Sequence, residues 1–288
     1  MIRRAYIEIL NTCNLSCAFC QTNTRPPQRM SVTDFCHVLD EVRTVTDYVY
    51  LHVQGEPLLH PEFDEIMNVC DLAGVHVQLV TNGTFLPSHP DLIRHPSLHR
   101  LSISLQSIEY QTIDTDAYIR GIIDLLTSLP EHPSFITDLR FWRTDQITLA
   151  KTSRMLDAIR CRYTPVPSGR DNQYRIAERV YVSFDNSFEW PEEQKMTAVP
   201  VRGTCLGARD QIAVLTDGTV VPCCLDADAH IPLGNIFETS LKDILQSARC
   251  TSLVKGFENR TVVEPFCAGC TFRKRFDRTS EKDKPGAV

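Results

Sequence analysis

Residues 5–20 read AYIEILNTCNLSCAFC, an apolar segment that is followed at once by three closely spaced cysteines. The segment Ala5–Leu10 has the apolar, partly β-branched composition of a buried strand. Cys13, Cys17 and Cys20 then lie within eight residues. Three thiolates at this spacing can bind three corners of an iron–sulfur cluster and leave the fourth metal without a protein ligand. An open coordination position is typical of a site built to react.

The spacing, the aromatic Phe19 before the last cysteine and the preceding strand together resemble the radical S-adenosylmethionine (radical SAM) enzymes. This resemblance implies a 4Fe–4S cluster on Cys13, Cys17 and Cys20, with the amino and carboxylate groups of S-adenosylmethionine on the open iron. It also places Phe19 among the cofactor-binding residues.

Composition and charge limit the class of protein. The chain has 288 residues, 42% hydrophobic and 23% charged, with a formal net charge of −6, which gives no general affinity for nucleic acid. Neither a secretory signal nor an apolar stretch long enough to span a bilayer is apparent. We therefore expect a cytoplasmic protein in a reducing compartment, whose twelve cysteines include metal ligands rather than disulfides.

From Arg3 to about Asp185, short β-branched runs alternate with amphipathic helical stretches. Ser31 with Asp34 predicts the start of one helix, and Gly74 the end of the next. Such alternation predicts an α/β fold with a parallel sheet and right-handed crossovers. Six units are fewer than a closed barrel needs, and the family resemblance implies an open, partial (β/α)6 TIM-like barrel. The predicted strands are Ala5–Leu10, Tyr48–Val53, Val75–Val80, Leu101–Leu105, Phe135–Trp142 and Val180–Phe184.

The helical alternation stops near Glu192, which predicts a barrel over residues 1–191 and a small α+β region over residues 192–288. In the second region, Gln211–Pro222 reads as a β-hairpin that turns at Asp217-Gly218. Ser240 with Asp243 predicts the start of a short helix. We expect the stretch Cys161–Gln173, rich in proline, glycine and charge, to be a loop before the last barrel strand.

A second group of cysteines lies in this C-terminal region: Cys205, Cys223, Cys267 and Cys270. Four separated thiolates can close a tetrahedral site, so zinc and an iron–sulfur cluster both remain open on the residues alone. The spacing C-x12-G-x4-C followed by C-x2-C resembles the shortened SPASM region called Twitch, which implies one fully ligated auxiliary 4Fe–4S cluster. Cys224 is an alternative ligand beside Cys223.

Further cofactor contacts are predicted at the ends of the strands. Gly55 and Glu56, in the run Gln54-Gly55-Glu56-Pro57, resemble the family's Gly-Gly-Glu-Pro motif, which implies that they position the amino group of S-adenosylmethionine; an ordinary strand-ending turn is the alternative. Asn82 and Ser104 lie at the ends of the third and fourth strands, and the family resemblance implies that they contact the cofactor's ribose or methionine part; an Asn-Gly turn and an outward-facing polar strand residue are the alternatives.

Two less specific predictions concern the fifth strand and the loop after it. Arg140 or Arg143 is a candidate partner of the cofactor's carboxylate, against the alternative of a surface arginine. Cys161 is a candidate hydrogen-atom donor, and it is the one residue for which we predict a catalytic role.

The resemblance implies an enzyme that cleaves S-adenosylmethionine reductively and abstracts a hydrogen atom from its substrate. A fully ligated auxiliary cluster suits electron acceptance, which points to net oxidation of a small molecule or, alternatively, modification of a peptide or protein. An electron donor such as a flavodoxin or ferredoxin is implied, and no membrane partner. Two other classes stay open: a non-catalytic zinc- or cluster-binding scaffold, and RNA modification through the basic run Arg273–Arg278.

Overall fold

The computed structural model describes residues 2–21, 24–143, 150–186, 188–191 and 195–277. Within these residues the main feature is an 11-stranded sheet with the order β12-β11-β10-β1-β2-β3-β4-β5-β8-β7-β6. All six predicted strands are confirmed as its central part. They are β1 (Arg4–Ile7), β2 (Tyr48–Tyr50), β3 (His76–Thr81), β4 (Leu98–Ser104), β5 (Ile136–Arg143) and β8 (Val180–Asn186).

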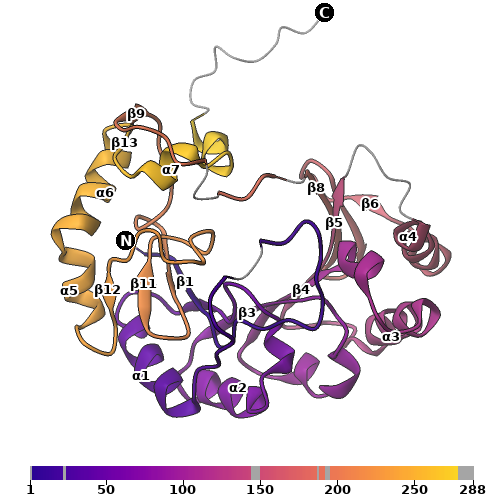
Figure 1. Cartoon of the computed structure of the whole chain (residues 1–288). Helices are drawn as coiled ribbons and strands as arrows, with labels where there is room; N and C mark the ends of the chain where they lie inside the picture. Colours follow the sequence, from indigo (N-terminus) through magenta and orange to yellow (C-terminus); the bar gives the residue numbers. More distant parts are fainter. Residues whose placement is uncertain (1, 22–23, 144–149, 187, 192–194, 278–288) are drawn as a thin grey trace, which may run out of the picture.

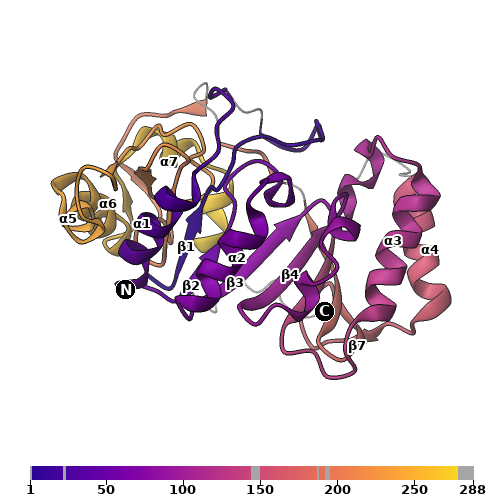
Figure 2. The same ribbon diagram turned by 90° about the horizontal axis from the view of Figure 1, so that it is seen from below.

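Each neighbouring pair among these six strands is parallel, as the strand–helix alternation predicts. Four helices lie on the outer side of the curved sheet (Figure 1): α1 (Val32–Arg43), α2 (Phe63–Leu72), α3 (Thr115–Ser128) and α4 (Ala150–Arg162). The sheet ends at β12 on one side and β6 on the other, so it is an open barrel. Figure 2 shows α3 and α4 side by side at one end and the C-terminal helices at the other.

Local sequence signals explain where the helices begin and which face they bury. The Ser31 hydroxyl accepts a hydrogen bond from the Asp34 backbone N–H at 3.1 Å, which confirms the predicted start of α1. On β4, Leu101 and Ile103 belong to the main apolar core beneath the helices. Ser104, on the opposite face, lines a cavity. On β4, the alternation therefore separates the apolar face under the helices from the face that lines the cavity.

One edge of the barrel differs from the prediction. Cys161 lies in the last turn of α4, and the segment predicted as a loop continues into β6 (Val166–Pro167), which pairs with β7 (Gln173–Ala177). Strand β7 then pairs antiparallel with β8. Gly169, with a φ of +85°, lies in the tight connection between β6 and β7, so this segment is not one long loop.

The predicted C-terminal hairpin is confirmed as β10 (Gln211–Val214) and β11 (Thr219–Val221). Gly218 has a φ of +83°, and a Cβ there would lie 2.3 Å from the Phe237 ring, so the turn requires glycine. An unpredicted feature is that β10 pairs in parallel with β1 over four residues. The C-terminal region thus extends the barrel's own sheet.

The remaining C-terminal elements cover this edge (Figure 1). Ser240 caps the predicted short helix α5 by accepting from the Asp243 N–H at 3.2 Å. A second helix, α6, follows directly and was not predicted. The elements are β9 (Val201–Arg202), β12 (Gly234–Asn235), α5 (Leu241–Gln246), α6 (Ala248–Glu258), β13 (Thr261–Val262) and α7 (Pro265–Gly269). None of the helices in the described part of the chain is both long and apolar enough to cross a bilayer.

Candidate active site

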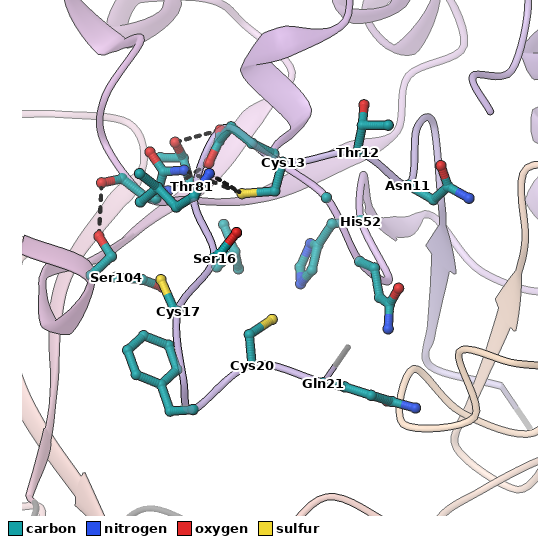
Figure 3. Close-up of a pocket in the computed structure, with 18 of the residues that line it drawn as sticks. Asn11, Thr12, Cys13, Ser16, Cys17, Cys20, Gln21, His52, Thr81 and Ser104 are labelled. Atoms are coloured by element: carbon teal, nitrogen blue, oxygen red, sulfur yellow. Dashed lines mark hydrogen bonds between the residues drawn. The ribbon is translucent and has the colours of Figure 1, made fainter. Parts of the chain in front are cut away.

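A cavity of about 590 Å³ opens at the carboxyl ends of the barrel strands, beside the loop that carries the first three cysteines. In the view of Figure 3, Thr81 and Ser104 lie on one side of this loop and His52 and Gln21 on the other. The lining includes all three cysteines and five of the predicted cofactor contacts: Phe19, Gly55, Glu56, Asn82 and Ser104. The carboxyl ends of parallel strands are the usual position of a site in such folds.

The cysteine loop presents its thiols to this cavity. Cys13 and Cys20 are exposed and Cys17 is half-buried. The Cys13 sulfur accepts hydrogen bonds from the Leu15 N–H at 3.4 Å and from the Asn82 amide at 3.7 Å. Partial burial raises the pKa of all three thiols, and with repulsion from Cys20 and Cys13 it raises that of Cys17 to about 12. The free thiols are thus protonated near neutral pH, and metal binding has to displace these protons.

The donor set fits an iron–sulfur cluster. In the part of the chain that the structure describes, no three cysteine, histidine or acidic side chains are grouped around the position of one metal ion. In a 4Fe–4S cluster each cysteine binds a different iron, so its thiols stand farther apart than the ligands of a single ion. Three thiols on one short loop, turned to a common cavity, meet this requirement.

Gly55 fixes the end of β2 against the start of the cysteine loop. Its φ is +79°, and a Cβ would lie 2.7 Å from the Leu10 carbonyl and 2.8 Å from that of Thr12. The next N–H, of Glu56, donates to the Thr12 carbonyl at 2.9 Å. Glycine is therefore required here because the end of β2 closely approaches the start of the cysteine loop.

The Glu56 carboxylate is 2% exposed and accepts three hydrogen bonds from the protein itself. The donors are the Leu58 N–H at 3.2 Å, the Thr81 hydroxyl at 2.6 Å and the Asn82 N–H at 2.7 Å. Burial raises the pKa of Glu56 to about 7, although these three hydrogen bonds oppose the shift. Glu56 thus holds the end of β3 in place; its predicted contact with a cofactor ammonium remains a prediction.

Asn82 connects the end of β3 to the cysteine loop. Its side-chain amide donates to the side-chain oxygen Oδ1 of Asn14 at 2.8 Å as well as to the Cys13 sulfur. Its backbone carbonyl accepts hydrogen bonds from the Tyr118 hydroxyl at 2.6 Å and the Ser107 hydroxyl at 3.2 Å. Asn82 is therefore rigidly placed at the wall of the cavity.

Ser104 and Arg140 lie opposite each other on β4 and β5. Ser104 lines the cavity, whereas Arg140 is half-buried beside it and is close enough to lower the pKa of His52. The side chain of Arg143, the other arginine considered, lies outside the described residues.

A chain of aromatic rings runs from the cysteine loop to the C-terminal region. Phe19 packs on Trp142 with ring centroids 4.8 Å apart, Trp142 on Phe188 at 5.8 Å, and Phe188 on Phe272 at 4.9 Å. The Trp190 indole N–H donates to the Phe19 carbonyl at 2.7 Å. Phe272 is two residues after Cys270, so these rings join the surroundings of the two cysteine groups.

The four C-terminal cysteines come together from distant parts of the chain. Burial, followed by repulsion from neighbouring thiolates, raises the pKa of Cys205, Cys223 and Cys267; Cys205 is affected by Cys270, and Cys267 by both Cys205 and Cys270. Each of these effects requires the two sulfurs concerned to lie within electrostatic range of each other, so Cys205 lies near Cys223, Cys267 and Cys270, and Cys224 lies within the same range of Cys205.

Cys224, the alternative ligand, faces a different partner from that of Cys223. Its thiol is hydrogen-bonded with the Tyr6 side chain, and burial raises its pKa to about 11. It packs against the small inner cluster around Val53 and Leu215. This arrangement supports Cys223 as the ligand.

Sequence reasoning missed a buried ion pair between β1 and the cysteine loop. Both Glu8 carboxylate oxygens accept from Arg25 at 2.6 Å, and they also accept from the Gln54 and Thr216 N–H groups at 3.2 Å. The Glu8 side chain is fully buried. A charged residue inside an apolar strand was the available signal, because such a residue needs a partner when buried.

Two cavity residues at the end of β2 were also given no role. Both side-chain amide atoms of Gln54 and Nδ1 of His52 are buried and have no hydrogen-bond partner among the described residues. Burial and the nearby Arg140 charge lower the pKa of His52 to about 4, so its ring is neutral near pH 7. These atoms are available to a ligand.

Two predicted features are not part of the cavity. Cys161 is exposed on α4 and is not among the residues that line the cavity. In the described part of the basic run, Arg273 is 4% exposed and donates to the Asp277 carboxylate at 2.8 Å, and Arg275 stacks on Phe272; Arg278 lies outside the described residues. Two of the charges that RNA binding would need, those of Arg273 and Arg275, therefore already contact other groups of the protein.

Comparison with known proteins agrees with this arrangement. Residues 7–125 match the radical SAM superfamily, and residues 205–271 match the SPASM iron–sulfur cluster-binding domain. The AdoMet-dependent heme synthase of Methanosarcina barkeri strain Fusaro is 24% identical over 321 residues, which cover 92% of this chain and 90% of the synthase. The GTP 3′,8-cyclase of Limosilactobacillus fermentum is 30% identical over 130 residues, or 41% of this chain and 39% of the cyclase.

Solved structures share the fold at low sequence identity. Native anSMEcpe with bound AdoMet and Kp18Cys peptide has a TM-score of 0.64 and 14% identity, covering 99% of this chain and 92% of that chain. Streptococcus suis SuiB bound to S-adenosylmethionine has a TM-score of 0.62 and 15% identity, covering 89% and 68%. The SPASM match favours an iron–sulfur cluster over zinc at the second cysteine group.

Proposed function

Because the chain carries a radical SAM domain followed by a SPASM domain, we propose that it is an oxidoreductase that removes a hydrogen atom and one further electron from its substrate. Cys13, Cys17 and Cys20 would hold a 4Fe–4S cluster, and this cluster together with bound S-adenosylmethionine would supply the one-electron reduction and the hydrogen-atom abstraction. The observation that carries the proposal is the placement of three thiols on one cavity, next to the rigid Glu56–Asn82 pair that contacts the start of the cysteine loop.

The cavity residues have distinct proposed roles. Cys13, Cys17 and Cys20 hold the reactive cluster, and the Asn82 amide orients Cys13 through its sulfur. Gly55 and Glu56 fix the β2 end where the amino group of S-adenosylmethionine would bind. Phe19, Asn82, Ser104 and Arg140 are proposed as the remaining cofactor contacts, and Arg140 supplies the positive charge that a carboxylate needs.

The auxiliary site supports net oxidation. Cys205, Cys223, Cys267 and Cys270 would each bind one iron of a 4Fe–4S cluster, so no iron would be left open for substrate. The aromatic chain from Phe19 to Phe272 packs ring against ring between the two cysteine groups. This position suits acceptance of an electron from a substrate radical in the cavity.

The substrate is proposed as a small molecule or a peptide segment with hydrogen-bonding groups. Gln54 and His52 offer the cavity unpaired donor and acceptor atoms, which such groups can satisfy. The related folds of anSMEcpe and SuiB have been solved with bound peptides, which is compatible with this class.

Formation of haem is a second candidate. The heme synthase alignment spans both regions of the chain, whereas the cyclase alignments span about 40% of it. Titration of the anaerobic protein with haem, followed by its visible absorption, tests this candidate: saturable binding at one site per chain supports it, and the lack of any spectral shift contradicts it.

The main proposal is tested on anaerobically prepared protein. We expect about eight irons per chain, corresponding to two 4Fe–4S clusters. With S-adenosylmethionine and a reductant such as a flavodoxin or ferredoxin system, 5′-deoxyadenosine should form. Stoichiometric zinc without iron, or the failure of iron-loaded protein to cleave S-adenosylmethionine, would contradict the proposal.

A further inference from the structure

A loop of the C-terminal region reaches back to the cysteine loop of the barrel. The Asp228 carboxylate accepts hydrogen bonds from the Gln21 side-chain amide at 3.2 Å and from the Thr24 hydroxyl at 2.7 Å. These partners are 207 and 204 positions away in the sequence. One carboxylate thus holds the segment that directly follows Cys20.

Asp228 is itself fixed by the turn that carries Cys223. The Asp226 N–H donates to the Cys223 carbonyl at 3.1 Å. The buried Asp226 carboxylate accepts from the His230 N–H at 2.8 Å and the Ile231 N–H at 2.9 Å. The residues between Cys223 and Ile231 therefore form one compact turn, and the position of Asp228 follows from it.

The contact also determines which way the Gln21 amide faces. An ionised carboxylate only accepts hydrogen bonds, so the NH2 group of Gln21 must face Asp228. The other amide atom, Gln21 Oε1, is buried without a hydrogen-bond partner among the described residues, and Gln21 lines the cavity. This oxygen can accept a hydrogen bond from an N–H or O–H group of a bound ligand.

We propose that Asp228 is a positioning residue for the first cysteine site: it holds the loop beyond Cys20 through Thr24 and presents Gln21 Oε1 to the ligand in the cavity. A residue of the auxiliary-cluster region then sets the shape of the other site by direct contact. The affinity and electron paramagnetic resonance readouts below rest on the proposed binding of S-adenosylmethionine, whereas the deuterium-exchange readout does not.

The test is Asp228→Ala in the full-length, iron-loaded protein. We expect faster deuterium uptake in peptides from residues 11–29, because the loop loses two hydrogen bonds. Calorimetry should show the dissociation constant of S-adenosylmethionine rise about tenfold, the factor that corresponds to about 1.4 kcal/mol. The electron paramagnetic resonance signal of the first cluster should respond less to S-adenosylmethionine, while the total iron content is unchanged.

Matched variants keep the test decisive. Asp217→Ala removes an exposed carboxylate from the same region and should change none of these readouts. Asp228→Asn retains an acceptor for Thr24 and should recover part of the effect. Thr24→Val alters the other partner and should be non-additive with Asp228→Ala.

The outcomes separate this inference from the proposed function. Unchanged deuterium uptake and unchanged affinity in Asp228→Ala would overturn the inference, as would loss of auxiliary iron with normal exchange in the cysteine loop. If the wild type bound no S-adenosylmethionine, the proposed function would fail, while the deuterium measurement would still decide the role of Asp228.

Discussion

The two cysteine sites of this molecule are built in opposite ways. The first takes three thiols from one loop of eight residues, and two of these thiols are exposed to a cavity. The second takes four thiols from residues 205 to 270, where burial raises the pKa of each. A short loop leaves one side of a cluster open to a ligand, whereas ligands from four positions enclose it and tie distant segments together.

The residues that support the two sites also differ in what they hold in place. Around the first site they hold the loop: Asn82 contacts Cys13, Arg25 pairs with Glu8, and Asp228 holds Gln21 and Thr24. At the second site we expect a bound cluster to connect the hairpin to α7 and its following turn through the cysteines themselves. We expect the first site to lose activity when altered and the second to lose structure.

The largest expected effect is on the first site. Cys13→Ala, Cys17→Ala or Cys20→Ala should abolish 5′-deoxyadenosine formation and leave about four irons in the protein, because no spare cysteine lines the cavity. Chromatography of the reaction products and iron analysis are the measurements. Cys161→Ala, on the exposed end of α4, is the control for S-adenosylmethionine cleavage. Undiminished cleavage in all three variants would refute the ligand assignment.

Replacing Cys267 and Cys270 together should alter structure more than the first-site variants do. We expect the loss of about four irons and rapid proteolysis beyond residue 195, because metal binding contributes folding energy to a region with few long elements. Product formation should also fail, since the electron acceptor is lost. Cys224→Ala should retain the iron. Near-full iron content and normal turnover in the double variant would contradict both the ligand set and the oxidative role.

Glu56→Ala should reduce the affinity for S-adenosylmethionine without removing iron. The lost hydrogen bonds to a charged group are worth roughly 1.5–3 kcal/mol, so the dissociation constant should rise by about tenfold or more. Calorimetry on the iron-loaded protein measures this, and Glu62→Ala, at an exposed carboxylate nearby, is the control. Equal affinities for the wild type and the Glu56 variant would leave Gly55-Glu56-Pro57 as a purely structural turn.

The smallest expected effect is a pH dependence of stability. The pKa of Glu56 is raised from 4.5 to about 7, so the folded state binds an extra proton between these values. The extra proton on Glu56 stabilises the folded state. This contribution to the free energy of unfolding is complete below pH 4.5 and is lost as the pH rises through 7, with a slope of at most about 1.4 kcal/mol per pH unit. Urea unfolding of metal-free wild type and Glu56→Gln should differ in this slope. Parallel pH profiles would show that Glu56 is ionised throughout.

Several elements followed from local sequence patterns alone. Ser31 and Ser240 marked helix starts because a capping bond spans only three residues. Gly218 marked the hairpin turn because its backbone conformation excludes a side chain. Helix α6 and strands β6 and β7 were missed, since short elements in charged or proline-rich sequence have a weak periodic pattern.

The sequence by itself determined the chemistry that can occur: seven cysteines in two spacings, and six strand–helix units that place one group at the strand ends. Only the tertiary structure decided what surrounds that chemistry. The pairing of β10 with β1, the Glu8–Thr216 contact and the Asp228–Gln21 contact each join residues about 200 positions apart. Such contacts leave no local periodicity, because they depend on how complete elements pack. For the same reason, the Thr81 and Asn82 donors to Glu56 became apparent only when β2 and β3 lay side by side.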